Sequence, residues 1–237
     1  MQLNLVWNYF KQKNKQESIP HYDEDELPFV TIQLPLYNEL YVAKRLINSM
    51  AKLSYPNDRI EFQILDDSDD QTTKILQESI NSLANKDLFQ IIRRNDRNGY
   101  KAGALKHGLR TAKGDFIAIF DADFIPNKDF LLKTIPYFLR ESNLGVVQTK
   151  WGHLNKDYNI LTKCQAFGLN AHFSVEQVGR NSANHFINFN GTGGVWRKSC
   201  IKDAGNWQAD TLTEDLDLSY RAQLRNWKFK YLEHFES

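Results

Sequence analysis

The chain has few cysteines and no long apolar run, and both absences restrict its class. Only Cys164 and Cys200 occur in 237 residues, far apart and without metal-ligand spacing. This usage excludes a disulfide framework and favours a reducing, cytosolic setting with two buried thiols. No apolar stretch is long enough to cross a bilayer, and no signal-peptide pattern opens the sequence. The chain alone is therefore expected to be soluble.

A surplus of charge of one sign is also missing. Lys and Arg number 30 against 29 Asp and Glu, for a net charge of +1. The cations are scattered among the acids without the basic stripe of nucleic-acid-binding proteins, so nucleic acid is not expected as a partner. The six histidines have no ligand spacing, and neither a histidine-based metal site nor a Ser/His/Asp triad is predicted.

Hydrophobic residues make up 41% of the chain and aromatic residues 13%, enough for one substantial core. From Pro28 onward, short apolar runs alternate with amphipathic segments, which predicts an α/β fold with a mostly parallel sheet flanked by helices. The expected strands are FVTIQLP, EFQILDD, FQIIRR, DFIAIFDAD and LGVVQTKW, and the expected helices span residues 41–53, 71–83, 102–112 and 129–140. After Trp151 we expect a helix over residues 159–178, a Gly-rich segment, an acidic helix and a last strand, WKFKYLE.

Residues 1–27 form a separate region in this prediction, an N-terminal helix followed by a polar linker. Two interpretations of the helix stay open. It packs on the flank of the domain at residues 28–237, or it is an interfacial, juxtamembrane segment. The apolar residues at helical spacing are Leu3, Val6, Trp7 and Phe10.

Two acidic pairs fall at the ends of predicted strands, where open α/β sheets bind ligands. They are Asp66-Asp67 and Asp121-x-Asp123. A strand places residues i and i+2 on one side, so Asp121 and Asp123 are expected to reach one hard cation together, Mg²⁺ or Mn²⁺. Ser68, Asp69 and Asp70 offer Asp66-Asp67 a structural alternative, because such residues cap helices and one is expected near residue 71.

A third acidic pair, Glu214-Asp215, opens the late helix. Thr211 and Glu214 form a T-x-x-E capping box, so a structural role stands beside a functional one. An ionised Asp215 is also able to accept a proton. For Gly191, Gly193 and Gly194, a tight turn and close approach to a ligand both stay open.

Anion binding is expected at Lys101, which follows Gly99 at the start of a predicted helix, where free N–H groups favour negative charge. The three arginines of the preceding loop, Arg93, Arg94 and Arg97, are expected to be solvated.

Eight segments in fixed order resemble the catalytic domain of the family 2 processive glycosyltransferases. The resemblance is nearest to the cellulose synthase-like A and C groups, which are mannan, glucomannan and glucan synthases, and to their bacterial relatives. The segments run from about Phe29 to Glu233: IQLPLYNE, QILDDSDDQT, NRNGYKAGALKHG, FIAIFDADFIPNKDFL, VVQTKWGHLNKDYNILT, HFSVEQ, FNGTGGVWR and TLTEDLDLSYRAQLRNWKFKYLE.

The resemblance implies a GT-A fold with a nucleotide-binding first half and an acceptor-side second half. It also implies an inverting transfer of a hexose from UDP-glucose or GDP-mannose to a growing β-linked polysaccharide, with Mg²⁺ or Mn²⁺. Two alternatives stay open: a distributive transferase acting on a lipid or short acceptor, and a non-catalytic sugar-nucleotide-binding fragment. A nucleotidylyltransferase is disfavoured, because LPLYNE stands where its Gly-rich, basic loop would follow the first strand.

Residue roles also follow from the resemblance. It implies that Tyr37 and Glu39 line the nucleoside site, that Asp66 or Asp67 contacts the base, and that Lys101 lies by the diphosphate. Asp121 is implied to contact the donor and the metal, and Asp123 to bind the metal. Asp215 is implied as the general base, with Glu214 supporting the acceptor.

The family's Q-x-x-R-W motif and membrane helices are not found in residues 28–237. We therefore expect a truncated, weakly active core of an enzyme that works at the cytoplasmic side of the cell membrane or of a Golgi-type membrane. Its expected partners are a nucleotide-sugar donor, a glycan acceptor and, through the missing segments, the membrane.

Overall fold

The computed structural model describes Trp7 and residues 18–152, 158–171, 177–182 and 185–236. Apart from Trp7, the predicted N-terminal helix lies outside the described residues. The described part of the linker ends in the short 3₁₀ turn η1 (Glu24–Glu26). Its backbone is tied to the body of the molecule, because Arg59 donates hydrogen bonds to the carbonyls of Asp25 (2.6 Å) and Leu27 (2.7 Å).

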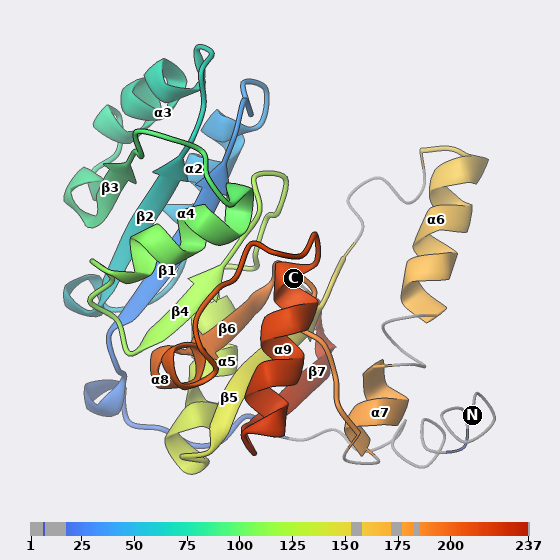
Figure 1. The fold of residues 1–237 in the computed structure, drawn as a ribbon. Coiled ribbons are helices and arrows are strands. Elements are labelled where there is room, and N and C mark those ends of the chain that lie inside the picture. Colours follow the sequence, from blue (N-terminus) through green and yellow to red (C-terminus); the bar gives the residue numbers. More distant parts are fainter. Residues whose placement is uncertain (1–6, 8–17, 153–157, 172–176, 183–184, 237) are drawn as a thin grey trace.

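The centre of the molecule is a seven-stranded sheet in the order β3-β2-β1-β4-β6-β5-β7 (Figure 1). Neighbouring strands are parallel except around β6, which runs antiparallel to both β4 and β5. This mostly parallel sheet confirms the predicted α/β class. The strands are β1 (Val30–Leu36), β2 (Ile60–Asp66), β3 (Phe89–Ile92), β4 (Phe116–Ile119), β5 (Leu144–Lys150), β6 (Gly194–Arg197) and β7 (Lys228–Glu236).

Helices cover both faces of the sheet (Figure 1), because the side chains of successive strand residues point to opposite faces. In β4, Phe116 and Ala118 pack with one core cluster, and Ile117 and Ile119 pack with the other. The first cluster includes α2 (Ala43–Met50), α3 (Thr72–Asn81) and α5 (Phe130–Arg140). The second includes α4 (Tyr100–Leu109), α8 (Lys198–Asp203) and α9 (Glu214–Leu224). Short 3₁₀ turns, η2 (Asn57–Arg59) and η3 (Lys86–Leu88), precede β2 and β3.

The predicted helix over residues 159–178 differs from the structure. It is described as α6 (Ile160–Ala171) and α7 (Val178–Ser182), with residues 172–176 between them outside the described part. Figure 1 shows α6 standing away from the sheet. Cys164 on α6 is therefore exposed, so the expectation of two buried thiols is wrong for it, whereas Cys200 is buried. Among the described residues, no helix is both long and apolar enough to cross a membrane.

One edge of the sheet is built to hold a ligand. Strands β2, β1 and β4 are parallel neighbours, so the loops that follow their last residues open side by side. Helix α4 lies tight against β1 and β2: a Cβ at Gly108 would lie 2.6 Å from Cδ2 of Leu65 and 2.7 Å from Nε2 of Gln33. This close packing holds the last turn of α4 against β1 and β2.

Candidate active site

A cavity of about 500 Å³ opens at this edge, within the usual size range of small-molecule sites. The loop after β1, the end of β2, the start of α4 and the turn after β4 all contribute to it. Its lining is Pro35, Leu36, Tyr37, Glu39, Asp67, Arg97, Lys101, Ala104, Asp121, Ala122 and Asp123. Six of the residues predicted from the sequence therefore share one cavity: Tyr37, Glu39, Asp67, Lys101, Asp121 and Asp123.

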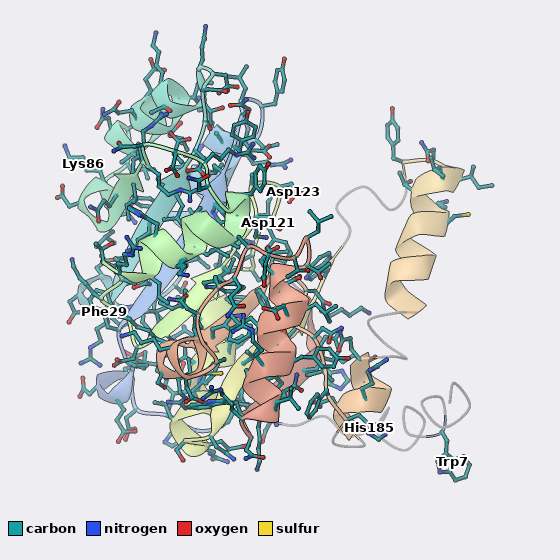
Figure 2. All side chains as sticks on the ribbon, in the orientation of Figure 1. Trp7, Phe29, Lys86, Asp121, Asp123 and His185 are labelled. Carbon is teal, nitrogen blue, oxygen red and sulfur yellow. The ribbon has the colours of Figure 1, made fainter. Side chains whose placement is uncertain are left out.

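Asp121 and Asp123 lie close together at the end of the sheet (Figure 2), although not for the reason given by strand alternation. β4 ends at Ile119, and both aspartates belong to the turn that follows. The backbone N–H of Phe124 donates to the carbonyl of Asp121 (3.1 Å) and closes that turn. The N–H of Asp121 donates to Oγ1 of Thr192 (2.9 Å), which ties the turn to the Gly-rich segment.

Lys101 lies in the first turn of α4, and its ammonium group contacts two parts of the site. Nζ lies 2.5 Å from Oδ1 of Asp121 and 3.0 Å from the carbonyl oxygen of Gly191. Asp215 is adjacent, because a Cβ placed on Gly191 would lie 3.2 Å from Oδ2 of Asp215 and 3.4 Å from Nζ of Lys101. Lys101, Asp121 and Asp215, which are distant in the sequence, thus meet around Gly191.

Negative charge exceeds positive charge around this meeting point. Burial raises the pKa of Asp121; the neighbouring Lys101 opposes this rise, and Asp123 and Asp215 add to it. Burial also raises the pKa of Glu39, and the charges of Asp123 and Asp121 raise it further. The carboxylates repel one another, so an additional cation would be bound favourably among them.

Glu214 belongs to the same acidic group, at the first position of α9. Burial raises its pKa, Lys101 lowers it, and the charges of Asp215 and Asp121 raise it again. Both residues of the third acidic pair are therefore electrostatically coupled to the turn after β4.

Asp121 and Asp123 suit a divalent cation. Their oxygens are hard ligands, and a Mg²⁺ site commonly takes one or two carboxylates together with substrate phosphates. Within the described residues, no three His, Cys, Asp or Glu side chains form a metal-binding group. The pair therefore fits a cation shared with a phosphate-bearing ligand better than a closed protein site.

Asp66 and Asp67 have different environments in the structure. Asp66 is fully buried, and its carboxylate accepts hydrogen bonds from the N–H of Ser68 (3.0 Å), the hydroxyl of Thr73 (2.6 Å) and Arg93 (3.1 Å). Asp67 lines the cavity. The expected cap of the next helix is supplied by Asp70, whose Oδ1 accepts from the N–H of Thr72 (2.8 Å). Of the two candidates for a base contact, only Asp67 faces the cavity.

The expectation that three arginines are solvated is wrong for Arg94, whose side chain is only 10% exposed, whereas Arg93 and Arg97 are exposed. Arg93 pairs with Asp66, and Arg94 pairs with Asp67, so both hold the loop after β3 against β2. Arg97 is exposed, and its guanidinium lies 3.2 Å from the centre of the Tyr37 ring, at the wall of the cavity. The sequence analysis missed Arg97, and the available signal was its position four residues before Lys101 in a loop at the ligand edge.

The predicted T-x-x-E capping box is not formed. Helix α9 begins at Glu214, and its N-cap residue, Thr213, makes no side-chain cap hydrogen bond. Oγ1 of Thr211 accepts from the N–H of Thr213 (3.3 Å), and within the first turn Oδ1 of Asp215 accepts from the N–H of Leu216 (2.8 Å). Two buried polar side chains further along α9 fix the helix. Oγ of Ser219 accepts from the N–H of Phe189 (2.9 Å) and donates to the carbonyl of Asp215 (2.6 Å).

Gln223 completes this connection one helical turn later. Its Oε1 accepts from the N–H of Ile187 (3.0 Å), and its Nε2 donates to the carbonyls of Ile187 (2.8 Å) and Ser219 (2.9 Å). Side chains of α9 thus supply the hydrogen bonds that a neighbouring strand would give to residues 187–189. The same segment continues to Gly191, whose carbonyl accepts from Lys101, and to Thr192, whose hydroxyl accepts from the N–H of Asp121. It therefore connects α9 with Lys101 and Asp121.

The Gly-rich segment is a turn that also approaches the site. Gly191 and Gly193 have positive φ angles of 78° and 67°, which glycine adopts without strain. Gln148 of β5 holds the turn through hydrogen bonds from Nε2 to the carbonyls of Thr192 and Gly193 (both 3.1 Å). The two interpretations of these glycines are therefore compatible.

Comparison with known proteins places the chain in a family. A family model described as "Glycosyltransferase like family 2" matches residues 28–236, so the chain belongs to this glycosyltransferase family. The chain is 46% identical over 212 residues to the probable glucomannan 4-beta-mannosyltransferase 4 of Oryza sativa subsp. japonica, with 86% of this chain and 38% of the relative covered. It is 42% identical to glucomannan 4-beta-mannosyltransferase 2 of Arabidopsis thaliana, with 96% of this chain and 45% of the relative covered.

A solved structure confirms the fold. The mannosyltransferase of Pyrobaculum calidifontis in complex with GDP-Man and Mn²⁺ superimposes with a TM-score of 0.76 at 19% identity, covering 98% of this chain and 63% of that one. This likeness bears out the predicted GT-A architecture. The chain spans less than half the length of the two plant relatives.

Proposed function

We propose that this chain binds a nucleoside diphosphate sugar in the cavity and transfers its hexose to a growing β-linked polysaccharide. The observation that carries the proposal is the convergence of Lys101, Asp121 and Asp215 on Gly191. A cation for the leaving group and a carboxylate for the attacking hydroxyl are the two groups that the reaction requires. GDP-mannose is the favoured donor over UDP-glucose, because the relatives described above are mannosyltransferases by name.

The donor spans the cavity in this proposal. Tyr37 and Arg97 lie on the nucleoside side with Glu39, and Asp67 is the carboxylate that reaches the base. Lys101 lies by the diphosphate and donates hydrogen bonds to its oxygens. Asp121 and Asp123 hold Mg²⁺ or Mn²⁺, which when bound neutralises charge on the diphosphate as it leaves.

Asp215 serves as the general base. Its carboxylate accepts the proton of the acceptor hydroxyl while that oxygen bonds to the anomeric carbon and the bond to the diphosphate oxygen breaks. A single displacement of this kind inverts the anomeric configuration. Glu214 supports the acceptor from the next position of α9. In the whole protein, segments outside this chain bring the site to the cytoplasmic side of the cell membrane or of a Golgi-type membrane.

The test variant removes the carboxylate that would accept the proton and keeps the size of the side chain. In the full-length protein, Asp215→Asn should lower transfer from GDP-mannose by about 10²-fold or more, the usual contribution of a positioned base, while nucleotide affinity stays near normal. Asp210→Asn is the matched control, because Asp210 is an exposed aspartate in the loop before α9. Transfer that is unaffected by Asp215→Asn would refute the assignment.

A further inference from the structure

A second cavity lies beside residues 125–128, which follow the active-site turn at Asp121 and Asp123. Its volume is about 640 Å³, and it is formed by α2 and by the chain that runs from the turn after β4 toward α5. We call it the α2 hollow. Its lining is Tyr41, Lys44, Arg45, Asn48, Ser49, Lys52, Ile125, Pro126, Asn127 and Lys128.

The charge of the α2 hollow is opposite to that of the active site. Four of its lining residues are cationic and none is acidic, whereas four carboxylates line the active-site cavity. The sequence analysis expected scattered cations, and along the chain they are scattered. The fold nevertheless brings Lys128 into one cavity with Lys44 and Arg45 of α2 and with Lys52, which follows the end of that helix.

These cations lack the acidic partners that other helices provide. On α5, Lys133 pairs with Asp129 at 2.6 Å, and on α9 Arg221 pairs with Asp217 at 2.5 Å, both at i,i+4 spacing. On α2, the positions three and four residues from Lys44 and Arg45 hold only uncharged side chains. In the described part of the chain, none of the hollow's four cations forms an ion pair with a carboxylate.

We propose that the α2 hollow binds an anion that carries two or more phosphate groups. A phosphate group carries about two negative charges at neutral pH, so two or more such groups match the four cations of this lining, among them Lys44 and Lys52. Between them, the amide of Asn48 and the hydroxyl of Ser49 face the same cavity and are able to donate hydrogen bonds to phosphate oxygens. Binding relieves the repulsion among the four cations that line this one cavity.

The experiment titrates sodium tripolyphosphate into the 237-residue chain by calorimetry, in EDTA so that no divalent cation bridges the anion to the active site. The test variant is Lys44→Gln/Arg45→Gln/Lys52→Gln. The matched control, Lys74→Gln/Lys86→Gln/Lys163→Gln, removes the same charge from exposed lysines elsewhere. We expect the test variant to lose about tenfold in affinity, since three exposed ion pairs are together worth about that factor, and the control to change less than about twofold.

A second arm identifies the carrier of the phosphate. Sedimentation with phosphatidylcholine vesicles, with and without phosphatidylinositol phosphate, is measured for the same three proteins. Binding to the phosphoinositide vesicles that only the test variant loses would assign the hollow to a lipid headgroup, and loss of tripolyphosphate binding alone would assign it to a soluble anion. Equal loss in the test and control variants, or no binding by the unmodified chain in either arm, would overturn the proposal.

Discussion

At the scale of the residue, Gly191 is the point on which the site depends. Its carbonyl accepts from Lys101, its positive φ turns the chain toward Thr192, and its missing side chain leaves room for Asp215. A side chain at this position would have to adopt the left-handed region, which costs about 1–2 kcal/mol for residues other than glycine.

Gly191→Ala should therefore destabilise the chain by about 1–2 kcal/mol and lower transfer by the full-length protein, because the new Cβ would press between Asp215 and Lys101. Chemical denaturation and a transfer assay measure the two effects. Gly168→Ala is the control, because a Cβ there meets nothing within 4 Å in α6, and alanine in a helix is neutral or stabilising. Equal stability and activity of the two variants would contradict the placement of Gly191.

Most site residues could be predicted from the sequence, but not the contacts that distinguish them. Asp66 and Asp67 are adjacent and chemically identical, and the sequence does not show that β2 ends between them, with Asp66 buried against Arg93 and Asp67 lining the cavity. The position of Arg97 at the site could not be predicted, because its stacking on Tyr37 joins segments that are 60 residues apart.

At the scale of the element, α9 is positioned by buried hydrogen bonds rather than by a cap. Ser219 and Gln223 pair with the backbone of Ile187 and Phe189, and these hydrogen bonds join the helix that carries Asp215 to the segment that carries Gly191. A buried N–H left without a partner costs about 1–3 kcal/mol.

Ser219→Ala should consequently lower the free energy of unfolding by about 1–3 kcal/mol, because the N–H of Phe189 loses its acceptor. Thr134→Val in α5 is a matched control. Its hydroxyl is also buried, but it donates only to carbonyls of its own helix, Phe130 (2.9 Å) and Leu131 (3.4 Å). Urea denaturation measures both changes. If Thr134→Val lowered the free energy of unfolding as much as Ser219→Ala, the hydrogen bonds between α9 and residues 187–189 would not contribute to stability more than an ordinary buried hydroxyl does.

Regular elements of the first half could be predicted because their signal is local. Apolar runs and helical periodicity located β1 to β5 and α2 to α5 within a few residues. The strand alternation predicted for Asp121 and Asp123 was wrong, because β4 ends at Ile119 and a turn follows. The start of α9 at Glu214 was as predicted, but its capping box was not formed, since a T-x-x-E pattern does not show whether tertiary hydrogen bonds have replaced the cap.

At the scale of the whole molecule, a net charge of +1 conceals a strong separation of charge. Acidic side chains gather at the ligand edge, and four cations gather in the α2 hollow. At the ligand edge, burial raises the pKa values of Glu39 and Asp121, and the neighbouring carboxylates raise them further.

Stabilisation of the chain by Mn²⁺ should accordingly grow with pH. The pKa values of Asp121 and Glu39 are raised from 3.8 and 4.5, so protons compete with the cation at low pH, and the competition disappears once the pH exceeds the raised values. The shift in Tm caused by Mn²⁺ should be larger at neutral pH than at about pH 5, and Asp123→Asn should abolish it. A shift that stays constant with pH, or that survives Asp123→Asn, would place the cation elsewhere.

The central claim is that the cavity lined by Lys101, Asp121 and Asp123 binds a nucleoside diphosphate sugar together with a divalent cation. The most direct measurement is calorimetric titration of GDP-mannose, and in parallel UDP-glucose, into the purified chain with Mn²⁺, compared with the Asp123→Ala variant. The account predicts saturable binding of one donor per chain, tighter for GDP-mannose, that disappears in EDTA and in Asp123→Ala. Absence of binding for both donors, or affinity that is unchanged in Asp123→Ala, would contradict it.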